Sequence, residues 1–154
     1  MRLSGGCSCG AVRFAIERYL YAQLCHCDAC KKRTGSAYGI SVVIENAALL
    51  QFHGETRIFK RIAESGKSVE YEFCPVCGSM IRWRVAALQD RQVLAGGAFD
   101  DPGAFEIAGE MYTANALPWA RIGCEITTAG EPDASYRSAL VKKAAKSKTS
   151  SMLR

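Results

Sequence analysis

Apolar and polar residues alternate along much of this chain, and that period of two is the pattern of β-strands with one buried face. In residues 11–17, the side chains of Val12, Phe14 and Ile16 fall together on one face. Residues 39–44 form a short apolar run rich in β-branched residues, which is typical of a buried strand. The same reasoning predicts strands over residues 11–17, 19–25, 39–44, 68–74, 80–85, 92–95 and 107–113.

Two further strands are predicted on either side of a turn signal. Residues 49–52 and 56–60 flank the tripeptide His53-Gly54-Glu55, and a glycine between two apolar runs favours a hairpin. We therefore expect these two segments to pair with each other.

Helical signals are few in comparison. Asp28 can N-cap a short helical turn that reaches Arg33 and ends at Gly35. Asp133 can N-cap a helix over residues 134–145, which has only a narrow apolar side. The sequence therefore predicts one short helical turn and one C-terminal helix.

The pattern as a whole predicts a mainly β fold of small antiparallel sheets, with short helical turns and a possible C-terminal helix. The length of 154 residues suits one domain, and an apolar content of 49% supports a small core. No internal repeat and no linker divides the chain. We expect a β domain over residues 1–132 and a basic C-terminal helix or tail over residues 133–154, partly disordered because the end is rich in Lys and Ser.

Cysteine spacing carries the strongest chemical signal. Thiolates at very short spacings are metal ligands far more often than disulfide partners. Two pairs can close one four-thiolate zinc site, and the remaining triplet supplies three ligands to a second zinc whose fourth position stays open. This division predicts one zinc for folding and one for chemistry. The three clusters are Cys7 with Cys9, Cys25 with Cys27 and Cys30, and Cys74 with Cys77.

The first predicted site joins the two pairs. The segment Cys74-Pro-Val-Cys77-Gly78 has the form of a knuckle whose sulfurs face one point, and Gly78 suits the positive φ needed after the second ligand. Cys7 and Cys9 share one face if the backbone is extended between them. Structural zinc contributes roughly 10–16 kcal/mol in small peptides, so we expect this metal to be required for folding.

The second predicted site is the triplet Cys25, Cys27 and Cys30. Its last two sulfurs lie at the start of the predicted helical turn, where free amides favour thiolates. An open zinc with three thiolates should bind an incoming thiol as a thiolate, so we expect it to make or break carbon–sulfur bonds. Two alternatives remain: His26 as the fourth ligand, against a satisfied or surface histidine, and Cys124 closing the site, against a small core residue.

Basic and hydroxyl side chains next to these clusters are candidates for substrate binding. Cations can hold the carboxylates of a peptide-like thiol, and hydroxyls can donate hydrogen bonds at the same rim. For any single cation, a solvent-facing charge is an equally good interpretation. The candidates are Lys31, Arg33, Thr34, Ser36 and Arg82.

The net charge of +5 originates at the C-terminal end. From Arg137 onward there are six basic residues and no acidic one, and without them 14 basic residues face 15 acidic ones. A nucleic-acid-binding face on the body is therefore not indicated. No apolar run approaches the roughly 20 residues of a transmembrane helix, and residues 1–5 form no apolar signal segment. We expect a cytoplasmic protein without membrane contact, where thiols stay reduced.

The cysteine motifs and their surroundings resemble the glutathione-dependent formaldehyde-activating enzyme (GFA) family, which includes centromere protein V-like proteins. The stretches that carry the resemblance are Gly6-Cys-Ser-Cys-Gly-Ala-Val-Arg-Phe14, Cys25-His-Cys-Asp-Ala-Cys-Lys-Lys-Arg-Thr-Gly-Ser36, Phe73-Cys-Pro-Val-Cys-Gly-Ser79, and Gly96 to Pro102 followed by Leu117-Pro-Trp119.

This resemblance implies a β-tent-type fold stapled by two zinc ions. The structural zinc would be held by Cys7, Cys9, Cys74 and Cys77, and the catalytic zinc by Cys25, Cys27 and Cys30. The implied activity joins glutathione to formaldehyde to give S-hydroxymethylglutathione and is classed as a carbon–sulfur lyase. A small thiol and an aldehyde would then be the partners of the domain over residues 1–132. The alternative is a non-catalytic zinc-stapled binding module that uses the basic tail as part of its contact surface.

Overall fold

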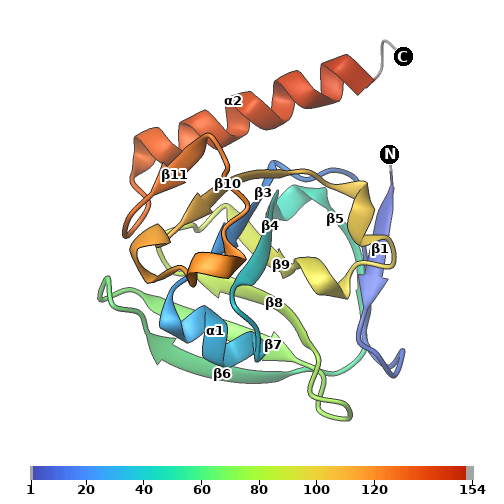
Figure 1. The fold of residues 1–154 in the computed structure, drawn as a ribbon. Coiled ribbons are helices and arrows are strands. Elements are labelled where there is room, and N and C mark those ends of the chain that lie inside the picture. Colours follow the sequence, from blue (N-terminus) through green and yellow to red (C-terminus); the bar gives the residue numbers. More distant parts are fainter. Residues whose placement is uncertain (1, 152–154) are drawn as a thin grey trace. The chain divides into compact units, whose positions relative to one another are not determined.

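The computed structural model describes residues 2–151 of the chain, with side chains described through residue 146 (Figure 1). Two compact units divide the chain. The first combines residues up to 19 with residues 42–104, and the second combines residues 20–41 with those from 105 onward. Each unit contains one cluster of cysteines, because Cys7, Cys9, Cys74 and Cys77 fall in the first and the triplet falls in the second.

The first unit holds a three-stranded antiparallel sheet in the order β1-β2-β5. Val12 and Ile16, which the alternation places on the inner face, are fully buried. Phe14 from the same face packs edge-on against Phe99 with ring centroids 5.1 Å apart. The strands are β1 (Leu3–Gly6), β2 (Arg13–Ile16) and β5 (Leu49–His53).

A second run of strands in the first unit has the order β4-β9-β8-β7-β6. The pairs β6–β7, β7–β8 and β8–β9 are antiparallel. Val69 and Tyr71 of β7 are buried, as the alternation predicts. The strands are β4 (Gly39–Glu45, whose first residues belong to the second unit), β9 (Arg91–Ala95), β8 (Met80–Val85), β7 (Ser68–Phe73) and β6 (Arg57–Ile62).

In the second unit, β10 lies between β11 and β3 and runs parallel to both. Helix α2 contacts all three strands of this sheet, and its buried residues Tyr136, Leu140 and Ala144 recur every fourth position. Gly109 of β10 lies so close to Leu140 that a Cβ atom there would come within 2.6 Å of Cδ2. The elements are β3 (Tyr21–Cys25), α1 (Asp28–Thr34), β10 (Ile107–Met111), β11 (Ile126–Thr128) and α2 (Ala134–Ser151).

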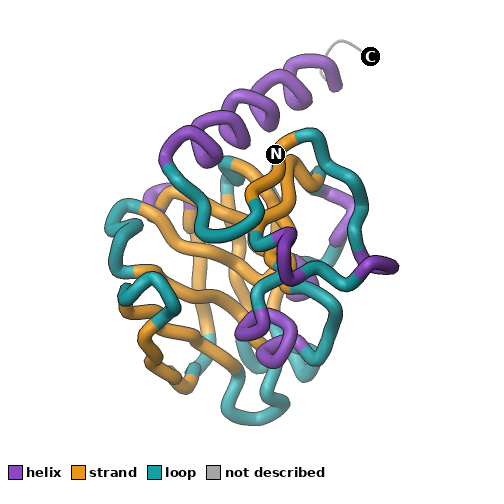
Figure 2. Tube along the Cα trace, turned by 60° about the vertical axis from the view of Figure 1, so that its left-hand side comes forward, coloured by secondary structure: helices purple, strands orange, loops and turns teal. Residues whose placement is uncertain are grey.

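Short 3-10 helices connect many of these strands. Apart from its helices, the chain consists of strands and loops (Figure 2). The mainly β fold class is therefore confirmed, although the parallel pairs of β10 make the sheets mixed and not purely antiparallel. The 3-10 helices are Asn46–Ala48, Gly96–Ala98, Pro102–Ala104, Thr113–Asn115 and Pro118–Ala120.

The predicted hairpin between residues 49–52 and 56–60 is wrong. Strand β5 pairs with β2, whereas β6 pairs with β7, so the two segments join different sheets. Gly54 has a φ of 94°, and a Cβ atom there would collide with the carbonyl of Ala11. This glycine is therefore needed for a close backbone approach to the chain before β2 and not for a two-strand turn.

Both predicted helices are present, with different boundaries. The N-cap of α1 is Cys27 and not Asp28, because the Cys27 side chain accepts from the Cys30 amide, while Gly35 ends the helix with a φ of 62° as predicted. Asp133 caps α2 by accepting from the Tyr136 amide at 2.8 Å. The helix continues to Ser151, since Ala and Lys are strong helix formers.

No helix within residues 2–151 has both the length and the apolar character needed to cross a membrane. Part of the C-terminal end was expected to be disordered, and its last residues, 152–154, lie outside the described residues.

Candidate metal centres

The four-cysteine cluster has the dimensions of a tetrahedral metal site. The Sγ atoms of Cys7, Cys9, Cys74 and Cys77 all lie within 4.8 Å of one another. The Sγ atoms of Cys7 and Cys9 are 3.5 Å apart, and those of Cys9 and Cys74 are 3.8 Å apart. Four sulfurs about 2.3 Å from one zinc ion form a tetrahedron with edges of about 3.8 Å. The cluster therefore fits one ion.

Backbone turns orient these sulfurs. In the knuckle, the amide of Gly78 donates to the Cys74 carbonyl at 3.0 Å, and Gly78 has the expected positive φ of 72°. The Val12 amide donates to Cys7 Sγ at 3.1 Å, which favours a thiolate. Hydrogen bonds from the hydroxyls of Ser79 and Ser8, together with backbone amides, lower the pKa of Cys77 to about 5. These donors stabilise the charged sulfurs that a metal requires.

The triplet forms an equally compact group of three. The Sγ atoms of Cys25 and Cys27 are 3.5 Å apart, and all three sulfurs lie within 4.8 Å of one another. Cys25 ends β3, Cys27 caps α1, and Cys30 lies in the first turn of that helix. Neither His26 nor Cys124 belongs to the group, and among residues 2–151 no other His, Cys, Asp or Glu does. The protein thus offers three corners of a tetrahedron here.

A cation lies beside the triplet. Arg33 Nη2 donates to Cys30 Sγ at 3.7 Å. The thiols of Cys25 and Cys27, together with the guanidinium of Arg33, lower the pKa of Cys30 to about 2. Gly39 leaves room for this arrangement, because a Cβ atom there would come within 2.9 Å of Arg33 Nη2 and 3.3 Å of Cys30 Cβ. The absence of a side chain at Gly39 thereby keeps the guanidinium next to the sulfur.

His26 is a satisfied core residue at its Nε2 atom. Nε2 and Oε2 of Glu110 are 2.8 Å apart, and both side chains are fully buried. Burial opposes ionisation of Glu110, but donation by the Cys124 amide and by His26 holds its pKa below the ordinary value. Because an ionised carboxylate only accepts hydrogen bonds, Nε2 of His26 must carry the proton. This pair ties the peptide between Cys25 and Cys27 to β10.

Replacing Glu110 should strongly destabilise the protein. Glu110→Ala leaves the His26 ring, a fully buried donor, without an acceptor, which costs roughly 1–3 kcal/mol, and it also removes the acceptor of the part-buried Cys124 amide. Glu110→Gln keeps one acceptor oxygen and should cost less. Chemical denaturation of the three proteins at neutral pH measures both differences.

The same pair predicts a pH dependence of stability. The pKa of Glu110 is lowered in the folded protein, so its contribution is complete above the unfolded value of about 4.3 and is lost as the pH falls through the folded value. The natural chain should therefore lose more stability on acidification than Glu110→Gln does. Equal losses in the two proteins would contradict this role.

The other predicted substrate residues have different surroundings. Lys31 pairs with Asp28 at 2.8 Å and donates to the Asn115 carbonyl at 3.0 Å. Thr34 donates to the Cys30 carbonyl at 2.9 Å. Lys31 therefore attaches α1 to the segment at Asn115, whereas the Thr34 bond lies within the helix.

Arg82 lies on β8 in the first unit, where it forms part of an interior ion pair. Its guanidinium lies 2.9 Å from the Glu72 carboxylate and stacks 3.7 Å from the centroid of the Phe52 ring. It also donates to Gln92 at 3.2 Å. Arg82 follows the knuckle closely in the sequence, which suggested a position at the rim of a substrate site. Its guanidinium is instead engaged by these contacts within the sheet.

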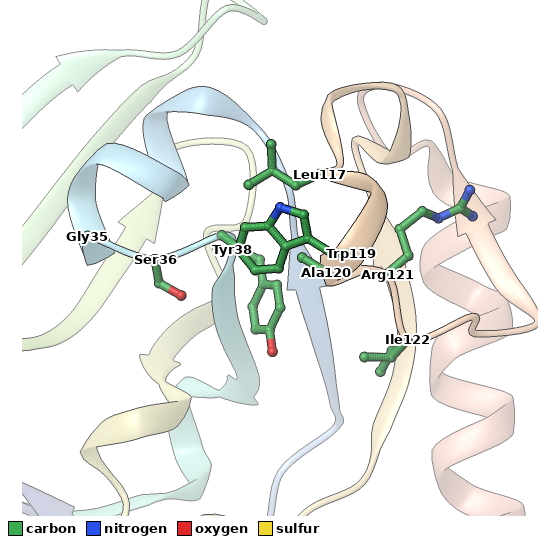
Figure 3. Close-up of a pocket in the computed structure, with 9 residues that line it drawn as sticks. Gly35, Ser36, Tyr38, Leu117, Trp119, Ala120, Arg121 and Ile122 are labelled. Atoms are coloured by element: carbon green, nitrogen blue, oxygen red, sulfur yellow. The ribbon is translucent and has the colours of Figure 1, made fainter.

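Ser36 lines a pocket of about 580 Å³ in the second unit (Figure 3). Residues 35–38, directly after α1, form one side, and the loop around Pro118–Ala120 forms the other. Figure 3 shows Trp119 and Tyr38 extending into the same space, whereas the Arg121 guanidinium points away from it. The pocket is therefore mainly apolar with a hydroxyl at its edge.

Sequence reasoning missed Glu110 and Gly39 at this site. A single acid inside the apolar run Ile107–Met111 was the available signal for Glu110, because an acid in a buried strand needs a partner. Nothing local marks Gly39, since its role depends on where α1 places Arg33 and Cys30.

Comparison with known proteins agrees with this arrangement. The fold is similar to the crystal structure of a Rhodobacter sphaeroides protein, at 18% identity and a TM-score of 0.51 over 63% of this chain and 87% of that chain. No curated protein matches the chain. A family profile described as glutathione-dependent formaldehyde-activating enzyme matches residues 2–115. Since that match spans most of the chain and includes both cysteine clusters, the protein belongs to the GFA family.

Proposed function

We propose that the chain is a zinc-dependent carbon–sulfur lyase that joins a small thiol such as glutathione to an aldehyde such as formaldehyde, and also catalyses the reverse reaction. The four-cysteine cluster would hold a structural zinc and the triplet a catalytic one. Cysteine-only donor sets of this size favour zinc among the divalent ions. When bound, a zinc ion with three thiolate ligands would lower the pKa of an incoming thiol.

The reaction needs few protein groups. The thiol loses its proton, its sulfur attacks the carbonyl carbon, and the π electrons of the carbonyl move to oxygen, which takes up a proton. One carbon–sulfur bond forms, no other product leaves, and the reverse path returns both reactants. Charge builds on the oxygen during attack, so a fixed cation nearby favours the transition state.

Arg33 is the residue best placed to serve that role. Its Nη2 atom is 3.7 Å from Cys30 Sγ, and Gly39 keeps the space for it. The guanidinium can either stabilise the developing oxygen charge or hold a carboxylate of the thiol. The pocket lined by Ser36, Tyr38 and Trp119 follows α1 directly in the sequence and offers room for the body of the thiol.

A single observation supports the proposal most strongly. Three sulfurs form a compact group to which residues 2–151 add no fourth His, Cys, Asp or Glu donor. Such a donor set is typical of a catalytic site and not of a closed structural one. The family's description as formaldehyde-activating supports the choice of substrates.

The test is the rate at which formaldehyde and glutathione equilibrate with their adduct. We expect the purified protein to accelerate this exchange, measured by NMR with ¹³C-formaldehyde, and Arg33→Ala to reduce the acceleration. Lys32→Ala is the matched control, because Lys32 is an exposed cation on the same helix. An absence of acceleration with glutathione, cysteine and 2-mercaptoethanol would refute the proposal.

A further inference from the structure

Strand β6 is a sheet edge with an unusual composition. It ends the strand order with β7 as its one neighbour among the strands of residues 2–151 (Figure 1). Three large apolar side chains on it are more than half exposed: Ile58 at 52%, Phe59 at 57% and Ile62 at 65%. Exposed apolar edge strands readily pair with another strand. The composition of this edge therefore calls for a partner.

Hydrogen bonding with β7 determines which backbone N–H and C=O groups of β6 point outward from the sheet. The amide of Ala63 donates to the Lys67 carbonyl at 2.8 Å, in the same register as the β6–β7 pairs. Because backbone groups alternate in direction along an antiparallel strand, residues 57, 59 and 61 also face β7. Ile58, Lys60 and Ile62 therefore direct their N–H and C=O groups away from β7.

We propose that β6 pairs antiparallel with β6 of a second copy of this chain, with Ile58 opposite Ile62 of the other copy and Lys60 at the two-fold axis. Closed two-fold pairing of one strand with itself requires outward-facing residues to meet outward-facing residues. In this register, Ile58, Lys60 and Ile62 of each copy meet their counterparts. Each of these pairs can exchange two backbone hydrogen bonds.

Side chains favour this register over its neighbours. Ile58 and Ile62 form apolar pairs on one face. On the opposite face Phe59 lies opposite Arg61 of the other copy, whose guanidinium remains over the Tyr71 ring of its own copy, so no like charges meet there. Shifting the register by one step in one direction places Arg57 opposite Arg61, and in the other direction it places Arg61 opposite itself. Either shift brings like charges together.

The central pair of lysines is compensated within each copy. Lys60 Nζ lies 2.5 Å from Glu70 Oε1 on β7, so each lysine enters the interface with its own counterion. Like charges directly opposite each other destabilise a sheet, and the Glu70 carboxylate of each copy offsets part of this repulsion. The charges on β6 are therefore compatible with pairing to β6 of a second copy in this register and not in the two neighbouring ones.

Sedimentation velocity of the full chain over 1–200 µM, roughly the range for a contact of moderate affinity, tests the proposal. We expect a reversible dimer. Lys60→Glu should raise its dissociation constant about tenfold, because the introduced carboxylates of the two copies would face each other beside Glu70. Mixing this variant with the natural chain should favour the mixed dimer in native mass spectrometry, since Lys60 of the natural chain then faces a carboxylate.

Arg57→Glu is the control, because it makes the same charge change on the same strand outside the three outward pairs. It should leave the dimer intact. A monomer at every concentration would overturn the proposal and show that the cations of β6 keep the edge unpaired. A dimer that Lys60→Glu does not weaken would place the interface elsewhere and overturn it equally.

Discussion

Cys74→Ala should lose one of two zinc ions per chain and leave the first unit unfolded. Cys74 is fully buried and joins a cluster whose other half, Cys7 and Cys9, comes from the start of the chain. Structural zinc contributes roughly 10–16 kcal/mol in small peptides, which equals or exceeds the total stability of a typical domain, about 5–15 kcal/mol. Metal analysis and circular dichroism of the purified variant measure the loss.

Cys124→Ala is the control for this experiment. Cys124 is only partly buried and lies outside both clusters, so this variant should keep two zinc ions and remain folded. If Cys74→Ala were folded with an unchanged zinc content, the four-cysteine cluster would not be a metal site.

Cys27→Ser should abolish thiol–aldehyde turnover while the protein stays folded. The Cys27 side chain has two roles, since it belongs to the triplet and caps α1 by accepting from the Cys30 amide. Serine is a good N-cap but a poor zinc ligand, so the helix should survive while the second metal is lost. We expect one zinc ion per chain and turnover reduced by about 10³-fold or more, the scale seen when a principal catalytic group is removed.

The two variants together separate folding from chemistry. Cys27→Ser should retain the dispersed NMR spectrum of a folded protein, whereas Cys74→Ala should not. Turnover by Cys27→Ser at the natural rate would show that the triplet does not carry the reaction.

The local pattern predicted the strands because successive side chains of a strand point to opposite faces, so buried and exposed residues alternate. In β7, Val69 and Tyr71 are buried where a period of two places them. Pairing partners depend on distant parts of the chain, and the failed hairpin illustrates this. Gly54 looked like a turn residue, but what it accommodates is the carbonyl of Ala11, more than forty positions earlier, and no local pattern contains that contact.

The candidate site was predictable to the extent that its ligands lie close together in the sequence. Three short clusters of cysteines indicated two metal sites, and the structure brings the sulfurs of each within 4.8 Å. The contacts of the residues around these cysteines were not predictable in this way. His26 and Glu110 are 84 positions apart, and Arg82 is held by Glu72 and Phe52, so only the folded sheets decide these contacts.

X-ray absorption at the zinc edge, combined with zinc content, distinguishes a metal centre with an open position from two fully cysteine-ligated ones. Seven sulfurs shared by two ions predict an average of 3.5 sulfurs per ion, with the remainder oxygen or nitrogen, and the same average in Cys124→Ser. One zinc ion per chain, or four sulfurs on every ion, would contradict the existence of a metal centre with an open position.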